Sequence, residues 1–153
     1  MIRDGILQVF THFRTVGGQG ILTSNLLAVK DRYLGRFSID EVIAEINEME
    51  KEGLVSATQK AIGLTDQGEE FVYGKFDLQA GVREFMAIFL HFKTGRNQIL
   101  PTGSLLAVKS KQLSPVSEKN LQAILNEAER LGYIKDGSSS SIVLTSDGFD
   151  FLS

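Results

Sequence analysis

The sequence predicts a mainly α-helical chain with small β-hairpins, an α+β fold built from two tandem copies of one unit. The first observation is a repeated pentapeptide, LLAVK, which occurs at Leu26–Lys30 and again at Leu105–Lys109. The second is the helical spacing of apolar residues in each half, followed by short runs typical of hairpin strands. The length of 153 residues suits two small domains. We expect one unit over residues 1–75 and the other over residues 76–153.

The repeat extends well beyond the pentapeptide. THFRTVGGQGIL at 11–22 aligns with LHFKTGRNQIL at 90–100, and LTDQGEEF at 64–71 aligns with LTSDGFDF at 144–151. Two single-residue adjustments suffice over about seventy positions, which indicates an internal duplication. Each copy is therefore expected to contain the same elements in the same order.

The first half of each unit is predicted to be two helices joined by a short extended segment. In the first copy, apolar residues at helical spacing predict a helix over 2–13, and a glycine-rich stretch ends it. The segment 20–23 is then extended. A second helix follows, which Thr23 or Ser24 would cap and which ends at Gly35.

A third helix and a hairpin complete the unit. The S-x-x-E sequence from Ser38 to Glu41 predicts a capping box at the start of the helix, and Gly53 ends it. Two strands at 54–57 and 61–64 are predicted to form a hairpin. The apolar residues of the third helix lie on one face, at positions 39, 42, 43, 46 and 49.

The ends of the two copies carry a family resemblance. The first copy reads E-x-E-K-E-G-L-V and then L-T-x-x-G-x-x-F, and the second reads E-x-E-R-L-G-Y-I and then L-T-x-x-G-x-x-F. With its order of helix, short strand, two helices and hairpin, the chain resembles tandem winged-helix proteins, and these endings resemble those of MarR-type regulators. The resemblance covers nearly the whole chain and implies a winged-helix fold for each copy. It implies no single function, because winged helices serve both as DNA readers and as protein-binding modules.

Composition and charge narrow the classes of function. Residues 1–78 contain eight Lys and Arg against twelve Asp and Glu, and the whole chain has a net charge of −3, which does not attract a polyanion. The absence of cysteine excludes disulfides and cysteine-based zinc sites and favours a reducing compartment. No apolar run approaches the roughly 20 residues of a membrane span, and the first residues lack the features of a signal peptide. We expect a cytoplasmic protein that does not contact a membrane.

The third helix of the first copy is acidic on its predicted outward face. In a DNA-binding winged helix this face enters the major groove, where carboxylates would repel the phosphates. Two interpretations remain: a solvated acidic face, or a docking surface for a basic protein partner. The candidate interface residues are Asp40, Glu41, Glu45 and Glu48.

The second copy is less acidic and is the candidate for binding duplex DNA. Asn and Gln on its third helix can make paired hydrogen bonds to adenine, and nearby basic residues could contact phosphates. The alternative is that the basic residues offset helix dipoles at helix C-termini. The candidate contacts are Arg96, Lys109, Lys111, Lys119, Asn120, Gln122 and Asn126.

One helix of the second copy is apolar around most of its circumference. The sequence VREFMAIFLHF at 82–92 predicts a helix enclosed on several sides. We expect residues 77–92 to form the joint between the two units and also a seam between two copies of the chain. The candidate residues for this interface are Phe85, Phe89 and Phe92.

No catalytic, cofactor-binding or metal-binding residues are predicted. His12 and His91 occupy equivalent positions but lack further ligands at metal-binding spacing, and the glycines at 17–20 lack the Lys-Ser/Thr of a phosphate-binding loop. The sequence favours a non-enzymatic tandem winged-helix module that acts mainly through protein–protein contacts in a regulatory or chromosome-associated assembly. The alternative is a DNA-binding transcriptional regulator that uses the third helix of the second copy.

Overall fold

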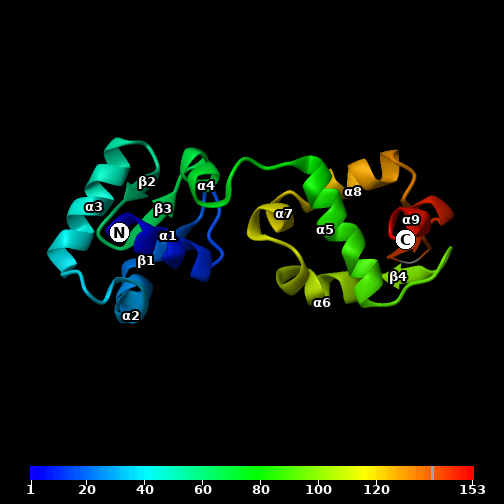
Figure 1. Ribbon diagram of the computed structural model, residues 1–153, viewed down its shortest axis with the longest axis horizontal. Helices are drawn as coiled ribbons and strands as arrows, with labels where there is room; N and C mark the ends of the chain where they lie inside the picture. Colours follow the sequence, from blue (N-terminus) through cyan, green and yellow to red (C-terminus); the bar gives the residue numbers. More distant parts are fainter. Residues whose placement is uncertain (139) are drawn as a thin grey trace. The chain divides into compact units, whose positions relative to one another are not determined.

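The computed structural model describes residues 1–138 and 140–153 and has an α+β fold (Figure 1). Helices are combined with two small three-stranded antiparallel sheets. The chain divides into two compact units, Met1–Lys75 and Phe76–Ser153. Each unit contains one sheet and one hydrophobic core of its own.

The first unit begins with two helices that contact each other and are joined through a short strand. Its sheet has the strand order β1-β3-β2, so the strand between the first two helices pairs with the second strand of the hairpin. The elements are α1 (Ile2–His12), β1 (Gly20–Leu22), α2 (Thr23–Leu34), α3 (Ile39–Lys51), β2 (Val55–Ala57), β3 (Ala61–Leu64) and α4 (Asp66–Tyr73).

The helix starts of the first unit confirm one sequence prediction and correct another. The Ser38 hydroxyl accepts a hydrogen bond from the Glu41 N–H, and the Glu41 carboxylate accepts one from the Ser38 N–H, each at 3.1 Å. The predicted capping box of α3 is therefore present. The prediction that Thr23 or Ser24 caps α2 is wrong, because the N-cap residue is Leu22 and has no side-chain cap. The Thr23 hydroxyl instead donates to the Gln59 carbonyl, at 3.2 Å.

The second unit has the same order of elements, with one additional helix. Its sheet has the strand order β4-β6-β5. The elements are α5 (Leu78–His91), β4 (Ile99–Pro101), α6 (Thr102–Gln112), α7 (Pro115–Lys119), α8 (Leu121–Arg130), β5 (Ile134–Asp136), β6 (Ser141–Leu144) and α9 (Ser146–Phe151). Ser139, which belongs to the hairpin predicted for this copy, lies outside the described residues.

The additional helix arises because the third helix of the second unit is interrupted. Ser114 caps α7, Pro115 occupies its first turn, and α7 ends at Asn120 after only five residues. The Asn120 amide donates to the Val116 carbonyl four residues earlier, at 2.8 Å. The Asn120 N–H donates to the same carbonyl at 3.1 Å, and a new helix, α8, starts after Asn120, whose ψ of 22° departs from helical geometry.

The L-T-x-x-G-x-x-F motif joins the hairpin to the closing helix in each unit. The Thr65 hydroxyl caps α4 by accepting from the Gly68 N–H at 2.9 Å, and it donates to the Gly53 carbonyl at 2.6 Å. A Cβ atom on Gly68 would lie 2.0 Å from the Leu54 carbonyl oxygen, so only glycine fits there. Thr145 caps α9 in the same way, through the Gly148 N–H at 3.0 Å.

The apolar helix α5 forms the centre of the second core. Phe85 and Phe89 have 0% exposure and pack with their rings edge to face, 5.6 Å apart between centroids. Both were expected at an interface, but they lie inside the second unit, and the surface open to a partner does not include them. The core alone accounts for their hydrophobicity. Phe92, at the end of the helix, is 37% exposed.

Candidate functional site

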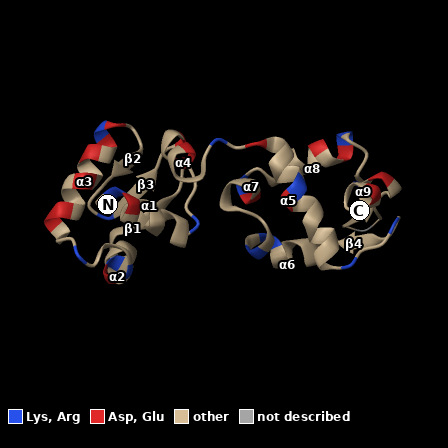
Figure 2. Ribbon diagram, viewed as in Figure 1, with Lys and Arg blue, Asp and Glu red and all other residues tan. Residues whose placement is uncertain are grey.

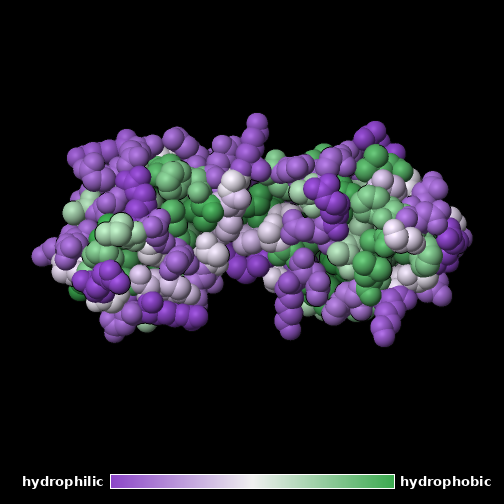
Figure 3. All heavy atoms as spheres, in the orientation of Figure 1, coloured by the Kyte–Doolittle hydropathy of each residue, from purple (hydrophilic) through white to green (hydrophobic). Residues whose placement is uncertain are grey.

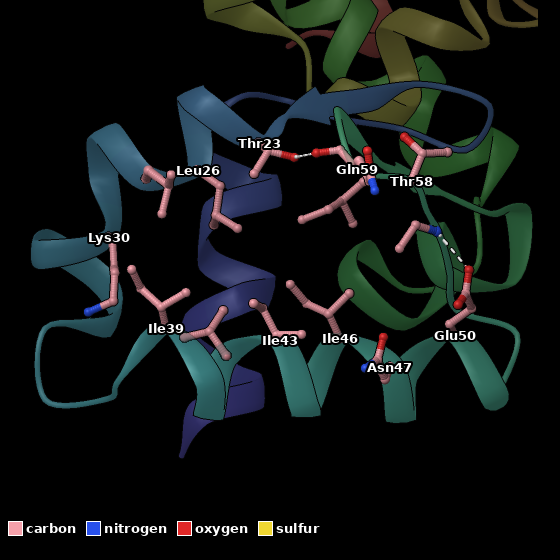
Figure 4. Close-up of a pocket in the computed structure, with 14 residues that line it drawn as sticks. Thr23, Leu26, Lys30, Ile39, Ile43, Ile46, Asn47, Glu50, Thr58 and Gln59 are labelled. Carbon is pink, nitrogen blue, oxygen red and sulfur yellow. Dashed lines mark hydrogen bonds between the residues drawn. The ribbon is translucent and has the colours of Figure 1, made fainter.

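A groove of about 600 Å³ lies between α2, α3 and the β2–β3 hairpin of the first unit (Figure 4). Ile39, Ile43 and Ile46 project into it from α3, and Leu26 faces them from α2. The remaining wall comes from the hairpin. The lining residues are Thr23, Leu26, Leu27, Lys30, Ile39, Val42, Ile43, Ile46, Asn47, Glu50, Ala57, Thr58, Gln59 and Ile62.

Three large aliphatic side chains of the groove remain open to solvent. Leu27, Ile39 and Ile43 are 49%, 52% and 49% exposed. Single exposed apolar residues are ordinary on a protein surface, but a contiguous group in a concave site is typical of a binding surface. Hydrophobic patches between hydrophilic residues are visible on the surface drawn in Figure 3.

Polar contacts hold the two walls of the groove at its hairpin side. The Glu50 carboxylate on α3 accepts a hydrogen bond from the Ala57 N–H of β2, at 2.8 Å. The bond between Thr23 and Gln59 ties the start of α2 to the tip of the hairpin. Lys30 lies at the opposite end of the groove from Glu50 (Figure 4). The walls therefore belong to elements that are bonded to one another, and the groove is largely preformed.

Acidic residues, drawn red in Figure 2, recur along α3, and most of their carboxylates have a partner within the unit. Glu41 belongs to the capping box, and Glu48 accepts from Lys51 at 3.1 Å. Glu45 was expected to face outward, but it is only 21% exposed and pairs with Arg3 of α1, whose Nε donates to it at 2.8 Å. Arg3 also pairs with Glu52 just beyond α3, and this hydrogen bond lowers the pKa of the Glu52 carboxyl. The pKa of Arg3 is raised in turn, first by its bond to Glu52.

Two carboxylates that follow lining residues in the sequence remain without such partners. Asp31 follows the lining residue Lys30 on α2, and Asp40 follows the lining residue Ile39 on α3. Both are exposed, and neither forms an ion pair or side-chain hydrogen bond within residues 1–138 and 140–153. The end of the groove near Lys30 thus has one open carboxylate on each of its two helices.

The two positions of the second unit that align with the exposed isoleucines of the groove are polar. Glu118 and Gln122 lie 79 residues after Ile39 and Ile43. Glu118 forms an ion pair with Lys109 at 3.8 Å, and Gln122 donates to Asn126 at 3.0 Å. Two helices of the second unit are therefore linked by a salt bridge, where the first unit has exposed isoleucines.

The residues predicted to contact DNA lie on different elements of the second unit, and several of them bond to neighbouring side chains or carbonyls. Arg96 pairs with Asp150 at 2.8 Å and lies over the Phe149 ring, 4.7 Å from its centroid. Asn120 sits at the junction of α7 and α8, bonded to the Val116 carbonyl. The remaining candidates do not share one helix: Lys111 is at the end of α6, Lys119 at the end of α7, and Gln122 and Asn126 on α8.

The two histidines each contact the helix that follows. His12 Nδ1 lies 2.9 Å from the Tyr33 hydroxyl, and His91 Nδ1 lies 3.5 Å from the Gln112 amide nitrogen. Among the described residues, no three His, Asp or Glu side chains come together as metal ligands. Both histidines therefore connect consecutive helices of their own unit.

The groove was not identified from the sequence, although a signal for it exists. Helical spacing placed Ile39 and Ile43 on one face of α3 together with Val42, Ile46 and Met49, without separating covered from open positions. Only the last three are buried. The apolar stripe of α3 is therefore wider than the core requires. Such an excess, beside an outward leucine in the preceding helix, is the pattern that could have indicated the groove.

Over residues 1–138 and 140–153, no helix combines the length and apolar composition needed to cross a bilayer. Comparison of the whole chain with protein-family models, with curated proteins and with solved structures found no match.

Proposed function

We propose that the chain is a non-enzymatic tandem winged-helix module, derived from an internal duplication, that acts mainly through protein–protein contacts. Its setting would be a regulatory or chromosome-associated assembly in the cytoplasm. The observation that carries this proposal is the groove of the first unit, where Leu27, Ile39 and Ile43 are each about half exposed. An exposed aliphatic group in a preformed concave site is stabilised when another apolar surface covers it.

The order of elements supports the winged-helix part of the proposal. Each unit begins with a helix, a short strand and a second helix. At least one more helix and a two-stranded hairpin follow. The early strand pairs with the second hairpin strand in both, with Ile21 opposite Ile62 and Leu100 opposite Ile142. The repeated LLAVK segment supports the duplication, because its first leucine is a buried core residue in both copies, Leu26 and Leu105.

Electrostatics supports protein binding over DNA binding in the first unit. Helix α3 carries five carboxylates and a single lysine. A helix with this charge would repel phosphates, whereas DNA affinity depends on Lys and Arg. The alternative function, a reader of duplex DNA, would therefore have to use the second unit, through Lys111, Lys119 and Gln122.

Titration with duplex DNA tests the proposal. We expect no binding of a labelled random-sequence duplex by the full-length chain at low or at moderate salt, measured by fluorescence anisotropy. A DNA reader would instead bind at low salt and lose affinity steeply as salt rises. Loss of such binding in the double variant Lys119→Glu and Gln122→Glu would assign it to the second unit and would replace the proposed function with the alternative.

A further inference from the structure

We propose that the groove of the first unit binds a basic amphipathic helix of a partner protein. This inference rests on the proposed function and specifies the chemistry of the partner. The occupant would place an apolar stripe between α2 and α3, with Lys or Arg on both sides of that stripe.

The apolar lining defines the stripe. Ile39 and Ile43 are four residues apart on α3, so they form one ridge, and Leu27 stands opposite them on α2. An amphipathic helix presents apolar residues at positions i, i+3 or i+4, and i+7, which match a groove bounded by two helices. Burial of the three half-exposed side chains supplies the main stabilisation of the complex.

The hairpin wall favours a helix over an extended peptide. A peptide that adds to a sheet needs free N–H and C=O groups at the edge strand. Here β2 is an edge strand, and the Ala57 N–H is already bonded to the Glu50 carboxylate, at 2.8 Å. That side chain blocks the edge that faces the groove. A helix satisfies its own backbone hydrogen bonds and needs no open edge.

The open carboxylates specify the charge of the partner. Glu41, Glu45 and Glu48 are engaged within the unit, in the capping box, with Arg3 and with Lys51. Asp31 and Asp40 have no such partner, and each follows a lining residue. Cations on either side of a docked stripe would therefore meet Asp31 and Asp40, while Lys30, which also lines the groove, would favour a single acidic residue at that end of the stripe.

A peptide selection on the full-length chain tests the inference. The probe is a displayed library of random peptides about 16 residues long, enough for about four helical turns. We expect the enriched peptides to carry apolar residues at helical spacing with flanking Lys or Arg. Their circular dichroism should show a gain of helix on mixing with the protein.

Three variants locate the binding. Ile43→Gln should lower the affinity for the selected peptides by about tenfold or more, because it removes an apolar anchor from the groove. The double variant Asp31→Asn and Asp40→Asn should lower this affinity by about threefold, and the difference from the unsubstituted chain should become smaller at high salt. Leu106→Gln is the matched control: Leu106 is 52% exposed on α6 of the second unit, and its loss should leave affinity unchanged. Glutamine is compatible with the helix at position 43, because Gln122 lies 79 residues later on α8.

The contrary results separate this inference from the function on which it rests. Selected peptides that are acidic, that stay extended, or that bind Ile43→Gln unchanged would overturn the helix-binding groove and leave a protein-contact role in place. Self-association of the chain that Ile43→Gln abolishes, seen by sedimentation, would assign the groove to a second copy instead. Enrichment of no peptide, together with salt-sensitive binding of duplex DNA, would overturn both proposals.

Discussion

Single residues in left-handed conformation end the first helix of each unit. Arg14 and Lys93 have φ of 52° and 53°, although neither is glycine. The Arg14 N–H bonds to the Thr11 carbonyl, and the next N–H bonds back to Phe10, which is the Schellman pattern of a helix end. Lys93 makes the matching bond to the Leu90 carbonyl, at 3.0 Å. Both helix ends therefore have a basic residue at a position whose backbone conformation glycine adopts more easily.

Replacing one of these residues with glycine should stabilise the protein. We expect Lys93→Gly to raise the free energy of unfolding of the second unit by about 0.5–1 kcal/mol, because glycine adopts positive φ without the steric cost of a Cβ atom. Urea denaturation checks this value. Lys93→Ala is the matched control, since it removes the same side chain but keeps the Cβ atom. An equal gain in both variants would show that the lysine side chain, and not its backbone conformation, is unfavourable.

At the scale of elements, the L-T-x-x-G-x-x-F motif explains how each hairpin is fixed to its closing helix. Its threonine caps the helix and also bonds back to the turn after the preceding helix. Its glycine allows the closing helix to approach the first hairpin strand. In the second unit a Cβ atom on Gly148 would lie 2.1 Å from the Tyr133 carbonyl oxygen. The motif is therefore a packing device in both units, whatever the chain binds.

Alanine at these glycines should loosen the hairpin. We expect Gly68→Ala and Gly148→Ala each to lower the free energy of unfolding by about 1–3 kcal/mol, because the added methyl group must displace backbone atoms. Gly103→Ala is the control. A Cβ atom there would have open space, and alanine favours helix α6, so stability should rise by about 0.5–1 kcal/mol. Chemical denaturation of the three variants measures these changes, and an unchanged Gly68→Ala would contradict the close approach.

Much of the element order could be predicted from the sequence, because local signals specify it. The capping box at Ser38 and the hairpin strands of the first unit lie where their residues indicate. The interruption at Asn120 was missed, because the non-helical backbone conformation of this one residue leaves no signal in the spacing of apolar residues. The groove was missed for a different reason. Periodicity shows that Ile39 and Ile43 share a side of α3, but only the packing of α2 and the hairpin decides how much of that side is covered.

At the scale of the whole molecule, the chain contains two separate hydrophobic cores. The first combines residues from α1 to β3, and the second combines residues from α5 to β6. Phe10 and Phe89 occupy corresponding central positions, with 1% and 0% exposure. Among the described residues, no core residue of one cluster belongs to the other. A destabilising substitution in one core should therefore lower mainly the stability of the unit that contains it.

The variant Phe85→Ala tests this separation in the full-length chain. Truncation of a buried phenylalanine costs about 3–5 kcal/mol, which is a large part of the roughly 4–12 kcal/mol expected for a unit of this size. We expect the amide resonances of residues 76–153 to broaden or collapse in an NMR correlation spectrum, while those of 1–75 keep their positions. Phe10→Ala should produce the converse pattern. Loss of both sets of resonances in either variant would show that the two cores fold as one cooperative unit, and α5 would then contribute to the stability of the first unit as well as its own.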